Sequence, residues 1–279
     1  MRNLLSWALC LAVLGCNQER NRSIELMNHG VEMGRQKLYE RAVNDLKQAV
    51  TVDPTNHLAH FNLGIVYKDQ KKWAEAASAF AEAVKYNPDN ASYRYELANA
   101  YLEGKRLDLA RSEFEAALKL DNKLYKAHFR LGTVLEAMEK YREADSEYRK
   151  SIEMNPRFIP AYVRLGNMYL DHDYDKEAIQ VFQNAVLAND SDAEAHYGLG
   201  VAHQKVKQYD EAIKEFKRAI ELNSDLYLAI YNLGMTYKAM DDKKNAKEWL
   251  QRFITTAGSR GGPDLVRAAQ DAIYQLDAP

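Results

Sequence analysis

An interval of 34 residues runs through almost the whole chain and constrains its fold more than any other feature. A Leu followed by a small residue recurs six times at this interval, as Leu63-Gly64, Leu97-Ala98, Leu131-Gly132, Leu165-Gly166, Leu199-Gly200 and Leu233-Gly234. Alanine keeps the same interval at residues 42, 76, 110, 144, 178, 212 and 246, and no repeat carries an insertion. Self-similarity at one fixed period indicates an architecture of stacked repeats.

Each repeat is predicted to be a pair of helices. Apolar residues recur at helical spacing on two segments of about a dozen residues, and neither segment can bury its apolar stripe without a neighbour. Position 1 of the repeats is at residues 23, 57, 91, 125, 159, 193 and 227. Small residues at positions 8 and 20 let two helix backbones approach each other. A large residue at position 24 fills the gap, as Leu46, Phe80, Phe114, Tyr148, Phe182, Phe216 and Leu250. We therefore expect seven repeats over residues 23–260 and a capping helix over residues 263–279.

These columns make the chain similar to the tetratricopeptide repeat family over residues 23–260. The resemblance implies an all-α fold, a right-handed superhelical solenoid of helix-turn-helix repeats with a C-terminal capping helix. It also implies that the first helix of each repeat lines a concave groove, into which positions 2, 5, 6, 9, 12 and 13 point.

The expected groove lining follows from these positions. Position 5 is aromatic in five repeats, although the fold itself asks for no aromatic residue there, and positions 6 and 9 add amides and arginines. The predicted partner-binding residues are Phe61, Asn62, Tyr95, Asn99, Phe129, Arg130, Arg164, Asn167, Tyr197, Tyr231 and Asn232. Aromatic rings supply contact area at low entropic cost, and Asn can donate to and accept from a peptide backbone at once. An extended or helical peptide of a partner fits this lining; the alternative is that the rings pack against neighbouring helices while the polar residues solvate the groove.

The carboxylate clamp of cochaperones, which grips a C-terminal carboxylate, is not expected. Lys126 and Arg130 match its last pair, but Glu96 stands where the clamp has Asn, and its first pair is missing. Arg130 and Arg164 are one helix step apart, with Lys126 nearby, and could bind an acidic side chain of a partner. The alternative is that Glu96 and Glu136 neutralise this basic spot.

Composition and spacing exclude several kinds of chemistry. Lys and Arg number 38 and Asp and Glu 40, so no single-sign field draws nucleic acid, and no nucleic-acid partner is expected. Both cysteines, Cys10 and Cys16, precede the repeats, which leaves no thiolate site downstream. His60, His128 and His196 share position 4 of alternate repeats, roughly 20 Å apart and too distant to share a metal ion. We expect no metal, no cofactor and no catalytic residue; because the repeats use up the chain, we expect no enzyme.

The N-terminus predicts a lipid anchor. Arg2 precedes an uncharged run that ends at Leu14, the pattern of a secretory signal peptide too short to span a bilayer. Val13-Leu14-Gly15-Cys16 resembles the bacterial lipobox. That resemblance implies a lipoprotein signal peptide at residues 1–15 and an acylated Cys16. An ordinary cleaved signal peptide with a chance Cys is the alternative.

Residues 16–22 are expected to form a tether between the acylated cysteine and the first repeat. Fully extended, the segment from Asn17 to Arg22 would reach about 20 Å, so the groove would work close to the membrane. By resemblance to lipoprotein sorting in enteric bacteria, Asn17 points to the outer membrane. Several acyl chains would hold the protein there durably, on the periplasmic face.

A lipid anchor joined to tetratricopeptide repeats alone resembles the pilotins of type IV pilus secretins. It is also similar to lipoproteins of outer-membrane assembly and of gliding-motility complexes. The resemblance implies a non-enzymatic scaffold or assembly factor, whose expected partners are envelope proteins such as a secretin, an outer-membrane barrel or motility-complex subunits. The alternative is a module that presents glycan or peptidoglycan substrate to an envelope synthase.

Overall fold

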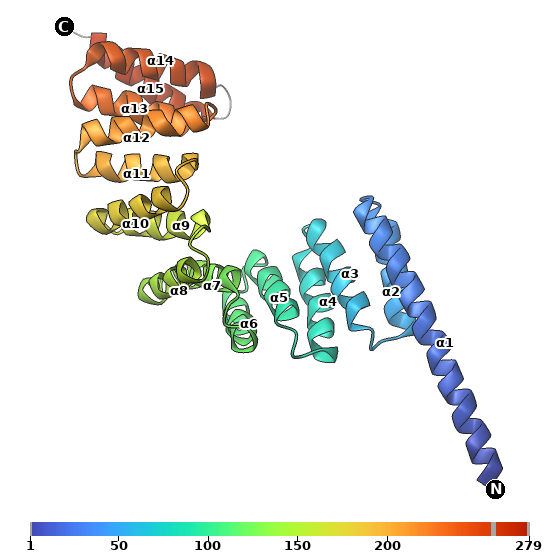
Figure 1. The fold of residues 1–279 in the computed structure, drawn as a ribbon. Coiled ribbons are helices and arrows are strands. Elements are labelled where there is room, and N and C mark those ends of the chain that lie inside the picture. The colour runs from blue at the N-terminus through green and yellow to red at the C-terminus, as the bar shows by residue number, and fades with distance from the viewer. Residues whose placement is uncertain (1, 258–260, 278–279) are drawn as a thin grey trace. The chain divides into compact units, whose positions relative to one another are not determined.

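A computed structural model of the chain describes residues 2–257 and 261–277 (Figure 1). Within these two ranges the chain forms fifteen α-helices and no strand. The helices are α1 (Arg2–Arg35), α2 (Tyr39–Val52), α3 (His57–Asp69), α4 (Trp73–Tyr86), α5 (Ala91–Glu103), α6 (Leu107–Leu120), α7 (Tyr125–Ala137), α8 (Tyr141–Met154), α9 (Ile159–Asp171), α10 (Asp175–Ala188), α11 (Ala193–Lys205), α12 (Tyr209–Leu222), α13 (Tyr227–Ala239), α14 (Lys243–Ala257) and α15 (Gly262–Asp277). From α2 to α14, corresponding helices begin 34 residues apart, so the predicted all-α fold of helical pairs is confirmed.

The helices form two compact units, one up to Glu147 and the other from Tyr148 onward, with the boundary inside α8. Consecutive helices pack against each other within each unit, α1 on α2 and α3 on α4 in the first, α11 on α12 and α13 on α14 in the second. Each unit therefore has a hydrophobic core of its own.

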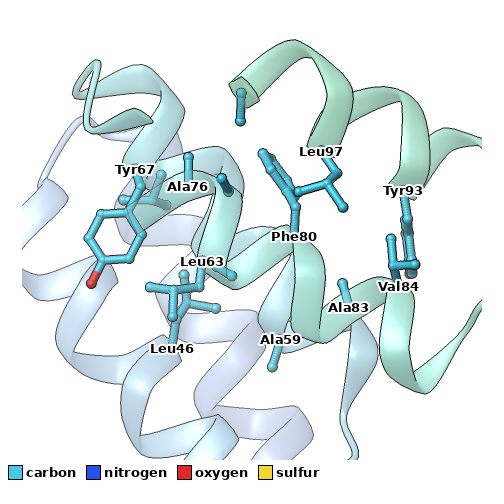
Figure 2. Close-up of a cluster of buried hydrophobic side chains, with 14 of the residues drawn as sticks. Leu46, Ala59, Leu63, Tyr67, Ala76, Phe80, Ala83, Val84, Tyr93 and Leu97 are labelled. Atoms are coloured by element: carbon cyan, nitrogen blue, oxygen red, sulfur yellow. The ribbon is translucent and has the colours of Figure 1, made fainter. Parts of the chain in front are cut away.

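The predicted small-and-large packing at positions 8 and 24 is confirmed in both units. In the first unit Phe80 is fully buried among Leu63, Ala83 and Leu97 (Figure 2). A Cβ atom built on Gly64 would lie 2.5 Å from the Phe80 ring, which no real side chain could do. Close backbone approach at position 8 is therefore what makes room for the core ring.

Polar side chains begin several of the helices. The side chains of Asn56, Asn90 and Asp192 accept hydrogen bonds from backbone N–H groups three residues later, at 3.0, 3.1 and 3.0 Å. Such N-caps satisfy donors that the first helical turn leaves unpaired. They explain why α3, α5 and α11 begin where they do.

The turn inside each repeat holds one residue in the left-handed region. Seven residues with φ between 58° and 62° recur every 34 residues: Lys37, Lys71, Lys105, Glu139, Asp173, Lys207 and Asp241. In the second repeat the N–H of Lys72 bonds to the Tyr67 carbonyl at 2.9 Å, which closes the end of α3 in a Schellman-type turn. Glycine is the usual residue at this place, but none of the seven left-handed positions holds one, so composition alone does not predict these turns.

A polar column joins neighbouring repeats at position 4. The ring nitrogens of His196 lie 2.6 Å from Glu215 Oε2 and 3.0 Å from the Asp190 carbonyl oxygen, and His128 is held in the same way by Glu147 and the Asn122 carbonyl. Both histidines are buried. His128 and His196 therefore tie the start of one repeat to the preceding turn and to their own second helix.

We expect Glu215→Ala to lower the free energy of unfolding by about 1–3 kcal/mol, because it leaves the buried His196 ring without its charged partner. Urea unfolding followed by circular dichroism measures this. Glu248→Ala, an exposed glutamate of α14, is the matched control and should change stability by less than about 0.5 kcal/mol. Equal effects of the two substitutions would contradict a structural role for the pair.

The N-terminal helix differs from the predicted tether. Residues 17–22 continue α1 as an exposed helix instead of an extended segment, so they rise about 9 Å at 1.5 Å per residue, not 20 Å. Packing begins at Ser23, whose buried hydroxyl donates to the Ala49 carbonyl at 2.8 Å and accepts from Asn56 at 2.9 Å. The described helices include none that is both long and apolar enough to cross a membrane.

The C-terminal helix α15 stands where the capping helix is predicted. Its Ala269, Ala272 and Leu276 are buried against the second unit's core, while Leu265 and Ile273 are partly buried. Gly262 starts the helix with φ of 70°, one residue before the predicted start. Residues 258–260, at the predicted end of the last repeat, lie outside the described part of the chain, as do residues 278–279.

Candidate functional site

The predicted groove residues all lie on first helices of repeats. In the first unit they are Phe61 and Asn62 on α3, Tyr95 and Asn99 on α5, and Phe129 and Arg130 on α7. In the second unit they are Arg164 and Asn167 on α9, Tyr197 on α11, and Tyr231 and Asn232 on α13. Arg164 and Asn167 are exposed and the other nine are half-buried. The backbone of Cys16 belongs to α1, and its side chain lies outside the described part of the structure.

The aromatic rings at position 5 pack into the fold, although Met27 and Val163 fill the same position in two repeats. Four of the five rings pack against an aromatic ring on the second helix of their own repeat. The centroid distances are 5.5 Å for Phe61 and Phe80, 5.8 Å for Tyr95 and Phe114, 6.1 Å for Tyr197 and Phe216, and 5.1 Å for Tyr231 and Phe253. Core contacts fix the orientation of these rings, and half-burial leaves part of each ring for a ligand.

Three groove asparagines use their donors inside the protein. The Nδ2 of Asn62 donates to the Leu58 carbonyl at 2.8 Å and that of Asn99 to the Tyr95 carbonyl at 3.0 Å. The Nδ2 of Asn232 donates to the Tyr197 hydroxyl at 3.2 Å. Each of these NH₂ groups has a second N–H, so it stays a prediction that these asparagines donate to and accept from a peptide.

A hollow of about 260 Å³ opens beside α5 in the first unit. Its lining residues come from α3, α4, α5 and α7: Lys68, Trp73, Tyr95, Glu96, Asn99, Glu103 and Arg130. Three of the seven, Tyr95, Asn99 and Arg130, are predicted groove residues. Of the others, Lys68 and Glu103 stand at groove positions 12 and 13, so the same family positions could have indicated them, whereas Trp73 stands at position 17, outside those positions.

The charges around the hollow are paired. Lys68 Nζ lies 2.9 Å from Glu96 Oε2, and Arg130 Nη1 lies 3.8 Å from Glu103 Oε1. Within the predicted basic spot, Arg130 is thus paired with Glu103, and Glu96 is paired with Lys68. Arg164 belongs to the second unit, and Lys126 lies 5.9 Å from the Tyr125 ring centroid.

One polar atom of the hollow has no partner. The Oδ1 of Asn99 is buried and accepts no hydrogen bond, while the Nδ2 of the same amide is committed to the helix backbone. A buried acceptor without a donor costs about 1–3 kcal/mol. Because this oxygen is buried, a ligand in the hollow does not reach it unless the Asn99 side chain moves.

The groove face of the second unit is closed by internal hydrogen bonds. Gln204 donates to Thr236 Oγ1 at 2.8 Å, next to the bond between Asn232 and Tyr197. Burial, and then the nearby Glu194, raises the pKa of Tyr197, and burial raises the pKa of Glu194. This face presents the half-buried phenol of Tyr197 and the exposed carboxylate of Glu194, in contrast to the open hollow of the first unit.

No three side chains of His, Cys, Asp or Glu gather closely enough to hold a metal ion within residues 2–257 and 261–277. The position-4 histidines have other partners, and His60 is 2.9 Å from the Pro54 carbonyl oxygen.

Comparison with known proteins places these helical pairs in one family. Models of the tetratricopeptide repeat match residues 63–124, 125–158, 193–226 and 227–258, and a further TPR repeat model matches residues 35–71, together more than half of the chain. The chain belongs to the tetratricopeptide repeat family. Residues 159–192, between the matches, form α9 and α10 of a further tetratricopeptide pair. No curated protein is significantly similar to the sequence.

Several solved tetratricopeptide structures have the same fold. YrrB, described as a TPR protein with an unusual peptide-binding site, is 26% identical with a TM-score of 0.56, over 70% of this chain and 99% of its own. A tetratricopeptide repeat protein from Parabacteroides merdae is 15% identical with a TM-score of 0.64, over 92% of this chain and 100% of its own. MamA is 24% identical with a TM-score of 0.56, over 58% of this chain and 94% of its own. The last two show the fold alone.

Proposed function

We propose that this tetratricopeptide protein is a non-enzymatic scaffold that binds a segment of a partner protein on its groove face, with the hollow beside α5 as the main contact. The observation that carries the proposal is the hollow itself, where Trp73 and Tyr95 stand beside the ion pairs of Lys68 with Glu96 and of Arg130 with Glu103. Ligand sites of this kind combine fixed aromatic walls with a few placed polar groups. The peptide-binding site described for YrrB supports a peptide as the ligand.

The proposal includes an anchor on the bacterial outer membrane. The lipobox-like sequence that ends at Cys16 supports acylation, and Asn17 supports the outer membrane with the repeats on the periplasmic side. The helical course of residues 17–22 would make the link between anchor and first repeat short and stiff. A scaffold so placed would meet envelope proteins, of which a secretin, an outer-membrane barrel or a motility-complex subunit are the proposed partners.

Affinity capture tests this function with a variant that alters the hollow and spares the core. Glu103→Arg places a second guanidinium beside Arg130 at a half-exposed site, and we expect it to reduce capture of the partner at least tenfold through like-charge repulsion. The full-length protein, extracted with its envelope in mild detergent, is the bait, and quantitative mass spectrometry is the readout.

The matched control is Glu153→Arg, the same charge change at an exposed position of α8. It should capture the partner as the unmodified protein does. If the two variants capture the same proteins in the same amounts, the hollow is not the binding site. If a glycan synthase is the main protein recovered, the alternative function, presentation of glycan substrate, replaces the scaffold.

A further inference from the structure

We infer that the groove face of α1 and α3 binds bulky aliphatic or aromatic side chains of the partner segment whose polar residues meet the hollow beside α5. This inference rests on the proposed function, because it names the kind of segment that the groove face takes. The surface concerned, called the apolar strip below, consists of the residues at positions 2, 5 and 9 of the first two repeats: Ile24, Met27, Val31, Leu58, Phe61 and Ile65.

Two side chains of the apolar strip are exposed although they are large and apolar. Ile24 is 39% exposed and Leu58 is 47% exposed, and no other large apolar side chain that the structure describes is exposed at a groove position. The helices that carry them are joined beside these residues, because Asn56 donates to the Ser23 hydroxyl at 2.9 Å. A ligand with an apolar surface therefore removes two neighbouring apolar groups from water at once.

Core packing fixes the base of the apolar strip. The Phe61 ring stacks on Tyr93 at a centroid distance of 4.6 Å and lies 5.5 Å from the Phe80 ring. Val31 and Ile65 are partly buried against the same core. A surface already held in place by its core loses little conformational entropy when a ligand covers it.

The apolar strip ends where the hollow begins. Positions 2 and 9 of the next two repeats are polar, as Ser92, Asn99, Lys126 and Thr133. Along α3, Ile65 is followed one turn later by Lys68, which lines the hollow and pairs with Glu96 on α5. Packed helices lie about 8–10 Å apart, so a path across α1, α3 and α5 is about 20 Å long. A segment on this path meets apolar groups at one end and paired charges at the other.

The size of the apolar strip favours a segment over a second copy of the chain. A stable interface between two folded proteins takes about 20–30 residues on each side. The strip has six residues, which is the scale of a short segment held by a few anchor side chains.

Amides on the same face favour a polypeptide over a lipid surface. Asn28 and Asn62 stand at position 6, between the apolar residues of positions 5 and 9, and Asn28 is exposed. An acyl layer that covered the strip would bury these amides without partners, which is costly. A peptide backbone offers them N–H and C=O groups while its side chains cover Ile24 and Leu58.

A displayed library of random peptides, about twelve residues long and so able to span the path as a helix or extended, tests the inference on the purified full chain. We expect selected peptides to carry aliphatic or aromatic residues toward one end and polar residues toward the other. Leu58→Glu should weaken their binding about tenfold or more by fluorescence anisotropy. Leu120→Glu, the same change at a leucine of α6 that is 43% exposed outside the groove positions, is the matched control and should change affinity less than twofold.

A second comparison assigns the contact to the apolar residues of the peptide. Their replacement by Ser should weaken binding about tenfold or more on the unmodified protein and less than twofold on Leu58→Glu. Thermal unfolding shows whether Leu58→Glu is folded, and Leu58→Ser, which adds no charge, replaces it in the same comparison if it is not.

The outcomes separate this inference from the proposed function. Peptides whose binding is lost on Glu103→Arg and kept on Leu58→Glu would overturn the role of the apolar strip and leave the scaffold standing. Peptides that bind both variants as they bind the unmodified protein would overturn both proposals. If no peptide binds while vesicles of phosphatidylethanolamine and phosphatidylglycerol bind in a Leu58-dependent way, the strip contacts lipid and both proposals are wrong. A dimer that Leu58→Glu dissociates in analytical ultracentrifugation would make the strip an interface between copies and overturn the inference alone.

Discussion

Phe182→Ala is expected to lower the free energy of unfolding by about 3–5 kcal/mol, the largest stability effect predicted for this chain. Phe182 is fully buried on α10 and fills the space between two glycines. A Cβ built on Gly166 would lie 2.5 Å from its ring, and one built on Gly198 in the next repeat 2.1 Å. The ring therefore packs against two successive first helices, and its removal leaves a cavity that both repeats border.

Urea unfolding of the full chain, followed by circular dichroism, measures this effect. Leu187→Ala is the matched control, because Leu187 lies on the same helix with 83% of its surface exposed, and should change stability by less than about 0.5 kcal/mol. A loss below about 1 kcal/mol for Phe182→Ala would mean that the second unit does not depend on packing between repeats.

Cys16→Ser is expected to abolish acylation of the protein, the second large effect. If Cys16 receives the lipid, cells fed an alkyne analogue of palmitate will label the unmodified protein and leave the Cys16→Ser protein unlabelled. Cys10→Ser, in the same N-terminal segment, is the matched control and should keep its label. The expected consequence is loss of stable membrane association. The variant would carry no acyl chain, and durable anchoring needs more than one.

Label retained after Cys16→Ser, or lost after Cys10→Ser, would contradict the lipobox interpretation. A mature protein that starts near residue 16 without any label would support the alternative, an ordinary cleaved signal peptide.

The fold was predictable because its determinants repeat. A small residue at position 8 and a large one at position 24 recur in every repeat. The close approach of Gly64 to Phe80, for example, occurs again between Gly166 and Phe182. Seven weak patterns that agree specify the helical pairs better than any single helix propensity could.

Other features, such as the left-handed turns and the orientation of single side chains, depend on atomic positions that the sequence does not specify. Non-glycine residues such as Lys71 occupy the left-handed turns because the hydrogen bonds around them outweigh the local cost. The partner of His196, Glu215, could have been predicted from the sequence. Glu215 stands at position 23 of its repeat. Glutamate also occupies position 23 in the repeats that carry Arg94 and His128 at position 4. The unpartnered oxygen of Asn99 could not, because it depends on which way one amide points.

The central claim, that partners bind on the groove face of the first unit, is tested most directly by site-specific photocrosslinking in cells. A benzophenone amino acid at Ser92, an exposed position-2 residue of α5, should crosslink to a partner protein in the envelope, and Glu103→Arg should remove that crosslink. The same amino acid at Tyr274, 78% exposed on α15, should give no crosslink that depends on Glu103. A partner crosslinked from Tyr274 and not from Ser92 would contradict the claim and place the binding surface away from the groove.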